Sequence, residues 1–210
     1  MKIAIIGAGN VGGALGRAWV KSGHDIMFGL RDPSSPKVAA LLATMGGRAT
    51  AGSVAEAAAY GAVVALCTPW NVTEAVVRDA RDFAGKIVID CTNPVESDLS
   101  GLAVGRTTSG AELVASWAPD ARVVKAFNTI GFEIMADPDF GGRGATMLIA
   151  GDDESAKAVA SDLARQIGFE PVNAGPLAIA RLLEPMALLW INLALIQGYG
   201  TRIAFRLERK

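Results

Sequence analysis

The chain has 210 residues and a formal net charge of −1, so its overall charge offers no attraction for nucleic acid or for an anionic membrane surface. Hydrophobic residues make up 51% of the chain, which is high for a soluble monomer and indicates an apolar surface that a second subunit covers. Cys67 and Cys91 end apolar runs without the Cys and His spacing of a zinc site, so we expect reduced core thiols, no metal and a cytoplasmic protein.

The first predicted strand and helix enclose a glycine-rich turn. Lys2–Ile6 is an apolar run typical of a strand buried on both faces of a parallel sheet, and a helix is expected directly afterwards over residues 11–21. Gly7, Gly9 and Gly12 stand at the G-x-G-x-x-G spacing of dinucleotide-binding turns. The first glycine allows the tight turn, the second lets the backbone approach a pyrophosphate, and the third lets the helix pack close to the strand. We therefore expect a dinucleotide site; a purely structural turn is the alternative.

The end of the second predicted strand, Asp25–Phe28, indicates which dinucleotide binds. An NAD site usually presents a carboxylate there for the ribose 2′-hydroxyl. This chain presents Arg31, whose planar guanidinium suits a phosphate, and Lys37 follows closely. We therefore expect NADP(H), although the neighbouring Asp32 could serve a ribose and leaves NAD open.

The rest of the chain alternates strands with helices. We expect strands at residues 48–51, 62–67, 86–90, 122–126, 145–150 and 170–173, and helices at residues 35–45, from 53 onward, 73–84, 109–117 and 154–167. This alternation predicts an α/β fold, with a Rossmann-type, doubly wound, mostly parallel sheet over residues 1–175. A small helical C-terminal segment over residues 176–210 follows it. Residues 92–108 lack any period and form a long loop, which in a compact domain is usually functional.

Two loops are expected at the edge of the sheet where ligands bind. Thr68, Pro69 and Trp70 follow one predicted strand, and residues 127–131 follow another. Because the carboxyl ends of parallel strands meet at one edge, both loops should lie beside the dinucleotide. The single histidine, His24, is expected in a surface turn on the opposite side, so the mechanism must do without a histidine acid or base.

Residues 177–198 are apolar on almost every side, and by length alone this run could span a membrane. Arg181, Glu184 and Pro185 interrupt it, and charged residues at such depth are costly, so we expect a soluble protein. We expect the segment to be buried in a homodimer, with an ion pair that joins Arg181 to Glu184 or to the partner. The alternative is a helix that lies across its own domain.

The motifs of the chain resemble those of one family, the F420-dependent NADP oxidoreductases, to which the cytosolic domains of the STEAP metalloreductases are related. The resemblance rests on Gly-Ala-Gly-Asn-Val-Gly at 7–12, Gly-Leu-Arg at 29–31, Pro-Trp at 69–70, Ser-Gly-Ala-Glu-Leu-Val at 109–114, Phe-Asn-Thr-Ile at 127–130, Gly-Asp-Asp at 151–153, and Ala-Gly-Pro-Leu with Arg-Leu-Leu-Glu at 174–184. These stretches run nearly end to end, so the resemblance covers the whole chain.

The resemblance implies NADP(H) as the cofactor and a deazaflavin (F420) or a flavin as the second substrate, stacked on the nicotinamide beneath the C-terminal segment. Residues 8–11 would contact the pyrophosphate, Arg31 the 2′-phosphate, Trp70 the cofactor groove, and Asn128 with Ile130 the nicotinamide. We expect Asn128 to orient the reacting rings and to transfer no proton. The cofactor-binding residues expected in full are Gly7, Ala8, Gly9, Asn10, Val11, Gly12, Arg31, Thr68, Pro69, Trp70, Asn128 and Ile130.

Three positions depart from the family pattern. Leu30 replaces a serine of the phosphate loop, Asn128 replaces a histidine, and Gly131 replaces a proline. The last two lie where the acceptor would bind, so the resemblance specifies the cofactor better than the acceptor.

The function expected is hydride transfer between NADPH and a deazaflavin, a flavin or another small acceptor. An imine or ketone reductase is the first alternative, but such enzymes normally need a general acid and a larger helical domain than residues 176–210 can form. The second alternative is a protein that senses NADP(H) without turnover.

Overall fold

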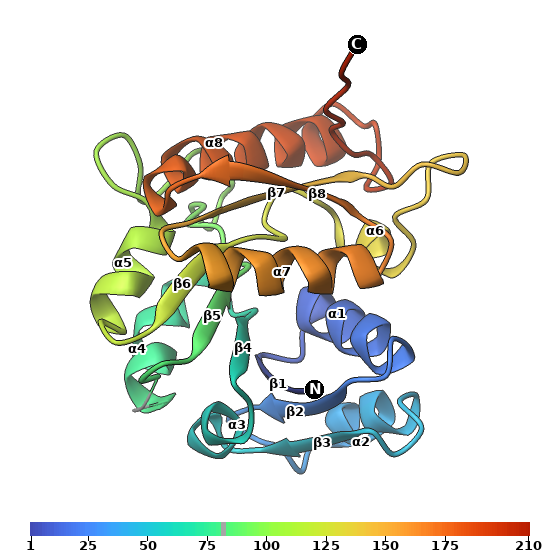
Figure 1. The fold of residues 1–210 in the computed structure, drawn as a ribbon, viewed down its shortest axis with the longest axis vertical. Helices are drawn as coiled ribbons and strands as arrows, with labels where there is room; N and C mark the ends of the chain where they lie inside the picture. The colour runs from blue at the N-terminus through green and yellow to red at the C-terminus, as the bar shows by residue number, and fades with distance from the viewer. Residues whose placement is uncertain (81–82) are drawn as a thin grey trace.

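The computed structural model describes residues 1–80 and 83–210, and the apolar runs of the sequence form its strands (Figure 1). The strands are β1 (Lys2–Ile6), β2 (Asp25–Gly29), β3 (Ala49–Gly52), β4 (Val63–Leu66), β5 (Ile87–Asp90), β6 (Arg122–Lys125), β7 (Thr146–Gly151) and β8 (Glu170–Gly175). The α-helices are α1 (Asn10–Lys21), α2 (Pro36–Ala43), α3 (Val54–Tyr60), α4 (Trp70–Ala80), α5 (Gly110–Trp117), α6 (Phe132–Ala136), α7 (Glu154–Gln166) and α8 (Ala180–Ile191). A 3-10 turn, η1 (Leu177–Ile179), precedes α8, and a π-helical turn, η2 (Asn192–Ile196), follows it.

The strands form one sheet in the order β3-β2-β1-β4-β5-β6-β7-β8. All neighbouring strands are parallel except β6 and β7, which are antiparallel. The predicted Rossmann-type, mostly parallel sheet is therefore confirmed. The chain builds outward from β1 in one direction and then returns to place β4 on the other side of β1. A crevice for a ligand is expected outside the carboxyl ends of these two strands, where the strand order reverses.

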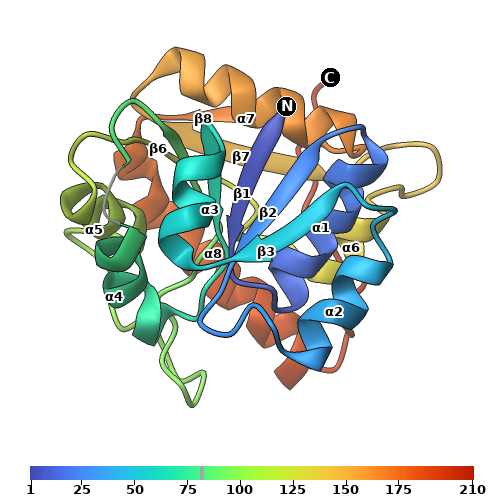
Figure 2. The same cartoon turned by 90° about the horizontal axis from the view of Figure 1, so that it is seen from below.

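Helices cover both faces of the sheet, as Figure 2 shows in a view along it. Apolar side chains of α1, α6 and α7 form one buried cluster on the sheet, and those of α3, α4 and α5 form the other. Strands between two helical layers are apolar on both faces, which explains their continuous apolar sequences. In β4, every residue is buried.

Two helices differ from the prediction. The helix expected at 73–84 begins earlier, at Trp70, because Thr73 Oγ1 donates to the carbonyl oxygen of Pro69 and completes a first turn there. Its expected end includes residues 81–82, which lie outside the described part of the chain. The five-residue helix α6 was not predicted, since so short a segment shows no helical period.

The prediction that His24 lies at the surface is wrong, because only 5% of it is exposed. Its Nδ1 lies 3.1 Å from the amino group of Met1, and its Nε2 lies 2.6 Å from Oε1 of Gln166. Gln166 is far along the chain, so no local pattern could indicate that it covers the imidazole. His24 joins the start of β1 to the end of α7, away from the carboxyl ends of the strands.

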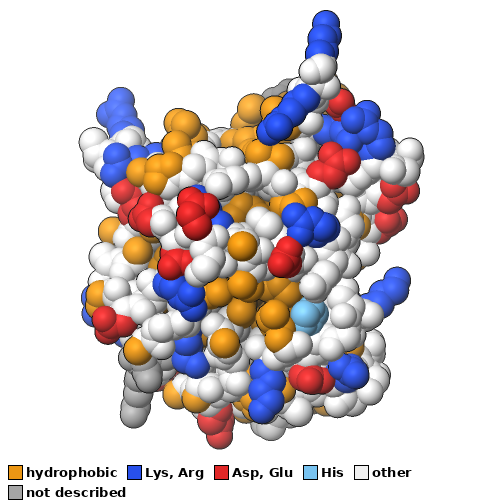
Figure 3. All heavy atoms as spheres, viewed as in Figure 1, with side chains coloured by type: hydrophobic (Ala, Val, Ile, Leu, Met, Phe, Trp, Pro, Cys, Tyr) orange, Lys and Arg blue, Asp and Glu red, His pale blue; other side chains and the backbone are white. Residues whose placement is uncertain are grey.

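The segment Leu177–Ile196 is long and apolar enough to cross a membrane by length and composition, with a mean hydropathy of 1.6. In the structure it lies across the α/β domain, with Leu183, Ala187 and Trp190 buried on its inner side. Its outer side is not enclosed, since 66% of Leu182 and 51% of Leu189 are exposed. Within one chain the helix thus lies across its own domain, with one apolar side buried and the other open. In Figure 3, apolar side chains gather along the top of the molecule, where Figure 1 draws α8.

Candidate active site

The turn between β1 and α1 has the geometry that its glycine spacing predicts. Gly7 has φ +104°, and a Cβ on it would lie 2.6 Å from the carbonyl oxygen of Cys67. A Cβ on Gly12 would lie 2.1 Å from the carbonyl oxygen of Gly7, so α1 can pack this closely only with glycine there. A Cβ on Gly9 would meet nothing within 4 Å, so this position faces open space. No side chain caps the start of α1, which leaves its first N–H groups for an anionic ligand.

The groove beside this turn ends at the side chain of Arg31. It is lined by Ala8, Gly9, Leu30, Arg31, Asp32, Ser35, Lys37 and Val38. Arg31 is exposed and has no hydrogen-bond or ion-pair partner among residues 1–80 and 83–210. The Asp32 carboxylate instead accepts hydrogen bonds from the amide and the hydroxyl of Ser34, at 3.1 and 2.7 Å. The guanidinium is therefore available to a phosphate, whereas the neighbouring Asp32 carboxylate already accepts hydrogen bonds within its own loop.

The loop after β4 leads directly into α4. The hydroxyl groups of Thr68 and Thr73 lie 2.9 Å apart, and Pro69 is exposed. Trp70 is half-buried, and its ring stacks on Trp117 at a centroid distance of 5.6 Å. This stacking holds the Trp70 ring against α5, at the carboxyl-end edge of the sheet.

The second residue of the loop after β6 is strained. Phe127 has φ +62°, a left-handed conformation that costs an ordinary residue about 1–3 kcal/mol. Trp19 and Phe169 hold its ring in edge-to-face contacts at 5.8 and 6.1 Å, and its N–H donates to Sδ of Met147. Such strain persists only where the surroundings impose it, and here it turns the chain so that Asn128 lies under α8.

Asn128 is 5% exposed, and its carboxamide is only partly satisfied. Its Nδ2 donates to Oδ1 of Asn93 and to the carbonyl oxygen of Leu183, both at 3.1 Å. Asn93 in turn donates from Nδ2 to the backbone oxygen of Asn128 at 2.8 Å. Oδ1 of Asn128 is buried and has no partner in the described part of the chain. A buried acceptor left unpaired costs about 1–3 kcal/mol, so this oxygen is a candidate ligand contact.

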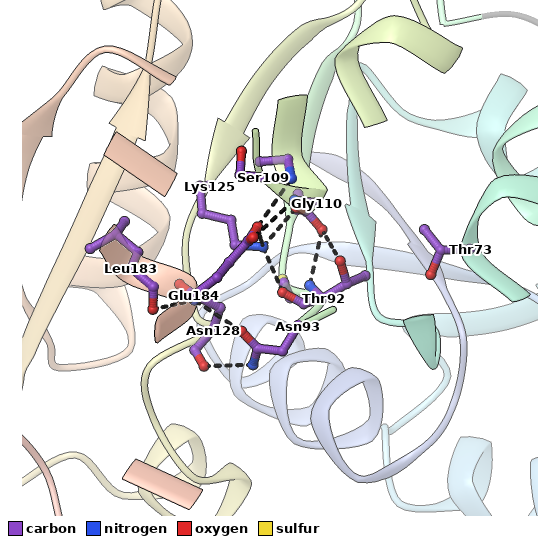
Figure 4. Close-up of polar contacts among 12 residues, drawn as sticks. Thr73, Thr92, Asn93, Ser109, Gly110, Lys125, Asn128, Leu183 and Glu184 are labelled. Carbon is purple, nitrogen blue, oxygen red and sulfur yellow. Dashed lines mark hydrogen bonds and ion pairs between the residues drawn. The ribbon is translucent and has the colours of Figure 1, made fainter. Parts of the chain in front are cut away.

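A buried charged cluster lies behind Asn128, and Figure 4 shows its contacts. Lys125 Nζ lies 2.8 Å from Oδ2 of Asp90 and 2.9 Å from Oε1 of Glu184, and it donates to the carbonyl oxygen of Thr92 at 2.6 Å. These three charged side chains are at most 1% exposed. Burial opposes the charge on Lys125, but attraction to Asp90 and Glu184 outweighs burial and raises the pKa of the ammonium group. Lys125 is therefore protonated at neutral pH.

Glu184 also binds the start of α5. Its two carboxylate oxygens accept from the backbone N–H groups of Gly110 and Ala111, at 2.9 and 3.1 Å. These bonds satisfy orphan donors at the positive end of the helix, which helps to offset the second negative charge of the cluster. A Cβ on Gly110 would lie 3.1 Å from Oε1 of Glu184, so a larger residue there would push the carboxylate away by a few tenths of an ångström.

The expected ion pair between Arg181 and Glu184 is not formed. Arg181 instead binds Glu112 through Nε and an Nη, at 2.8 and 2.5 Å, and this hydrogen bonding lowers the pKa of the Glu112 carboxyl group. Ser109 accepts from the N–H of Glu112, as expected for a cap at the start of α5. Arg181 and Glu184 lie three residues apart on α8 yet bind different partners at the same end of α5.

All positions that the sequence analysis assigned to the site lie after β1, β2, β4 or β6, whose carboxyl ends share one edge of the sheet. The cluster of Asp90, Lys125 and Glu184 was missed. A signal for it existed, because Asp90 ends one apolar predicted strand, 86–90, and Lys125 lies near the end of another, 122–126. Charges in such runs need a partner, and these strands are neighbours with Asp90 opposite Lys125.

Comparison with known proteins identifies the family. A family profile described as "NADP oxidoreductase coenzyme F420-dependent" matches residues 2–94. The F420-dependent NADP reductase of Methanothermobacter marburgensis is 32% identical over 220 residues, which cover 97% of this chain and 98% of that protein. The chain belongs to the F420-dependent NADP reductase family.

Two further comparisons agree with this result. Metalloreductase STEAP3 of Rattus norvegicus is 33% identical over 188 residues, which cover 89% of this chain and only 36% of that protein. A crystal structure from Arthrobacter sp. FB24, assigned as an F420-dependent NADP-reductase, is 29% identical and superposes with a TM-score of 0.91 over 100% of both chains. The family's fold therefore extends over residues 1–210.

The structure explains one departure from the family pattern. The family resemblance led us to expect proline where this chain has Gly131, and a Cβ on Gly131 would lie 2.8 Å from the carbonyl oxygen of Thr201 and 2.9 Å from the ring of Trp190. The Trp190 ring is held in place because its Nε1 donates to the carbonyl oxygen of Ile203 at 2.8 Å. A larger residue at position 131 would have to displace this ring, so the loop after β6 and the C-terminal segment fit each other here. Leu30 lines the groove and also packs on the core.

Proposed function

We propose that the protein transfers hydride between NADP(H) and a deazaflavin (F420) or flavin-type acceptor. One observation carries this proposal: three features follow strands whose carboxyl ends share one edge of the sheet. They are the open turn at Gly9, the free guanidinium of Arg31 and the unpaired buried oxygen of Asn128. A dinucleotide with a 2′-phosphate and a carboxamide offers a partner to each of them. Membership of the F420-dependent NADP reductase family supports the same cofactor.

The residues present fit NADP(H). Residues 8–11 with the free N–H groups of α1 would hold the pyrophosphate, and Arg31 would hold the 2′-phosphate. Oδ1 of Asn128 would accept a hydrogen bond from the nicotinamide carboxamide, and Ile130 would lie against the ring. The bound cofactor supplies the hydride, and the protein supplies position.

Hydride transfer from NADPH to a deazaflavin or flavin gives a reduced ring anion that can take its proton from water, so the reaction needs no acid from the protein. Asp90, Lys125 and Glu184 are buried and fully occupied by one another and by backbone groups. His24 lies beside the starts of β1 and β2, at the opposite edge of the sheet. An imine or ketone reductase would need a general acid, so the site supports direct hydride transfer better.

The acceptor is proposed to bind beneath the C-terminal segment. An apolar pocket opens there, lined by Thr129, Thr146, Leu148, Met186, Phe205, Arg206 and Leu207. Thr129 directly follows Asn128, so the pocket borders the loop that we assign to the nicotinamide. We propose that the protein acts in the cytoplasm, where the free thiols of Cys67 and Cys91 persist.

One assay separates this function from its alternatives. The protein is mixed with NADPH and, in turn, F420, FMN, FAD and a cyclic imine, and NADPH consumption is followed by absorbance. We expect turnover with F420 or a flavin. Turnover with the imine alone would favour an imine reductase, and tight NADPH binding without turnover on any acceptor would favour a sensor of NADP(H).

Arg31→Ala should weaken NADPH binding and leave NADH binding nearly unchanged. Loss of a charge-assisted contact to the 2′-phosphate corresponds to about 1.5–3 kcal/mol, or roughly a 10- to 150-fold rise in the dissociation constant. Fluorescence titration with both nucleotides measures this difference, and NADH serves as the internal control. The dissociation constant of NADPH for Arg31→Lys should lie between those of the wild type and Arg31→Ala, because lysine keeps the charge and loses the planar fork. Equal losses for the two nucleotides would show that Arg31 does not bind the phosphate.

Asn128→Ala should lower the rate of hydride transfer through misplacement of the nicotinamide. Because asparagine does not titrate, the variant should show no new pH-dependent limb between about pH 6 and 9. Single-turnover absorbance measurements across this range test both statements. A folded variant with the wild-type rate on its best acceptor would restrict Asn128 to a structural role in its turn.

We propose that the open side of α8 forms the interface of a homodimer. Leu182 and Leu189 are seven residues apart and exposed on one side of the helix, so they form an apolar stripe that a second copy can cover. Light scattering at micromolar concentration should give the mass of a dimer. Changing both leucines to glutamate should give a monomer. A monomeric wild-type protein would contradict the interface.

A further inference from the structure

The contacts of Lys125 lead through the loop after β5 to Asn128 (Figure 4). Lys125 Nζ donates to the carbonyl oxygen of Thr92 at 2.6 Å. The next residue, Asn93, exchanges two hydrogen bonds with Asn128, at 2.8 and 3.1 Å. The ammonium group therefore fixes the backbone of the residue that precedes the partner of Asn128.

A second set of contacts returns from Asn128 to Lys125 through α8. Asn128 Nδ2 donates to the carbonyl oxygen of Leu183 at 3.1 Å, and the next residue, Glu184, lies 2.9 Å from Lys125 Nζ. The contacts thus close into a ring. Three separate segments of the chain meet in it: the end of β5, the end of β6 and α8.

The ring leaves the Asn128 carboxamide one orientation. Its Nδ2 has two carbonyl acceptors, on Asn93 and Leu183, and a flipped amide would place its oxygen against both of them. The oxygen is consequently directed away from the ring, where it has no partner in the described part of the chain. The direction of this oxygen depends on the ring that contains Lys125.

We propose that Lys125 is a positioning residue for hydride transfer: through Asn93 and Glu184 it holds the Asn128 carboxamide with its free oxygen toward the nicotinamide. This inference rests on the proposed function, since it assigns the free oxygen to the cofactor. Lys125 itself contacts no ligand. The same ring fixes α8 and the apolar pocket beneath it relative to the cofactor, so donor and acceptor rings are held in one alignment.

Small displacements of reacting groups have large effects on rate, because a shift of about 1 Å can slow a reaction about 100-fold. A ring of short polar contacts between buried groups restricts such shifts in three segments at once. Attraction to two carboxylates keeps Lys125 charged, as the raised pKa indicates, so the ring persists across the working pH range.

The test compares Lys125→Met and Asn93→Ala with the wild type. Lys125→Met leaves two buried carboxylates without their cation and can fail to fold, whereas Asn93→Ala changes only a half-buried neutral side chain. In each folded variant, we expect single-turnover hydride transfer to fall about 10- to 100-fold. The dissociation constant of NADPH should stay within about threefold, because the phosphate contacts lie elsewhere.

The Asn128 side chain provides a readout independent of turnover. Its amide signals in a ¹⁵N NMR spectrum are those that disappear in Asn128→Ala. We expect these signals to shift and to exchange faster with water in Asn93→Ala, and in Lys125→Met if it folds. Lys157→Met is the matched control, since Lys157 is also buried and pairs with Glu154 at 2.7 Å outside the ring; it should change neither the signals nor the rate.

A double-mutant cycle then separates positioning from general weakening of the fold. If Asn93 acts through Asn128, Asn93→Ala should cause no further loss of rate in the Asn128→Ala background. If the rate losses of the two single variants multiply in the double variant, the inference is overturned. It is also overturned if Asn93→Ala keeps the wild-type rate and leaves the Asn128 signals unchanged. If no acceptor supports turnover at all, the proposed function fails, and the NMR comparison still decides whether the ring orients Asn128.

Discussion

Gly9→Ala is expected to fold like the wild type and to raise the dissociation constant of NADPH at least about tenfold, since bonds to a charged group contribute about 1.5–3 kcal/mol. A Cβ at this position meets no protein atom within 4 Å, so the substitution adds no clash within the chain. The added methyl group would instead occupy the space into which the pyrophosphate must come. Fluorescence titration with NADPH measures the loss, and circular dichroism with thermal unfolding verifies the fold.

Two other glycines serve as controls for this result. Gly101 also has free space around its Cβ position but lies in the loop after β5, so Gly101→Ala should affect neither stability nor binding. Gly12→Ala should instead lower the free energy of unfolding by about 3 kcal/mol or more, because its Cβ would lie 2.1 Å from the carbonyl oxygen of Gly7. Unaltered NADPH affinity in a folded Gly9→Ala protein would contradict the assigned phosphate turn.

Lys125→Met should lower the free energy of unfolding by about 3–5 kcal/mol, because it leaves Asp90 and Glu184 buried without their cation. Urea unfolding at pH 7 measures this change. Adding Glu184→Gln to Lys125→Met should destabilise the protein by less than the sum of the two single changes, since one of the unpaired charges is then removed.

The other buried lysine provides the contrast. Lys157 pairs with Glu154, but 78% of that carboxylate side chain is exposed, so water can replace the lysine. Lys157→Met should therefore cost less than about 1 kcal/mol. Equal losses for Lys125→Met and Lys157→Met would show that the three-charge cluster has no special role in stability.

Local sequence signals were sufficient for the cofactor half of the fold. The glycine spacing, the apolar run before it and the helix after it all describe contacts within about thirty residues, and such contacts leave a readable pattern. The doubly wound, mostly parallel sheet also followed, because alternating strands and helices permit few arrangements. The exact start of α4 did not follow, since it depends on one hydroxyl group, that of Thr73.

The features that sequence analysis missed depend on contacts between distant segments. His24 is covered by Gln166, and Lys125 is paired with Glu184. The rotation of α8 decides that Glu184 faces inward and that Arg181 reaches Glu112. That rotation results from the packing of the whole helix, for which an apolar run interrupted by charges gives no unique solution.

Because Glu184 lies late in the chain, the parts of the site form in a fixed order during synthesis. The glycine turn, Arg31 and the loop after β4 leave the ribosome early, and these residues need nothing from the C-terminal segment to adopt their shape. The N–H groups of Gly110 and Ala111 gain their acceptor only when Glu184, 74 and 73 residues further along, has been synthesised. The proposed nicotinamide contact at Asn128, whose Nδ2 donates to Leu183, is therefore complete only after translation has delivered α8.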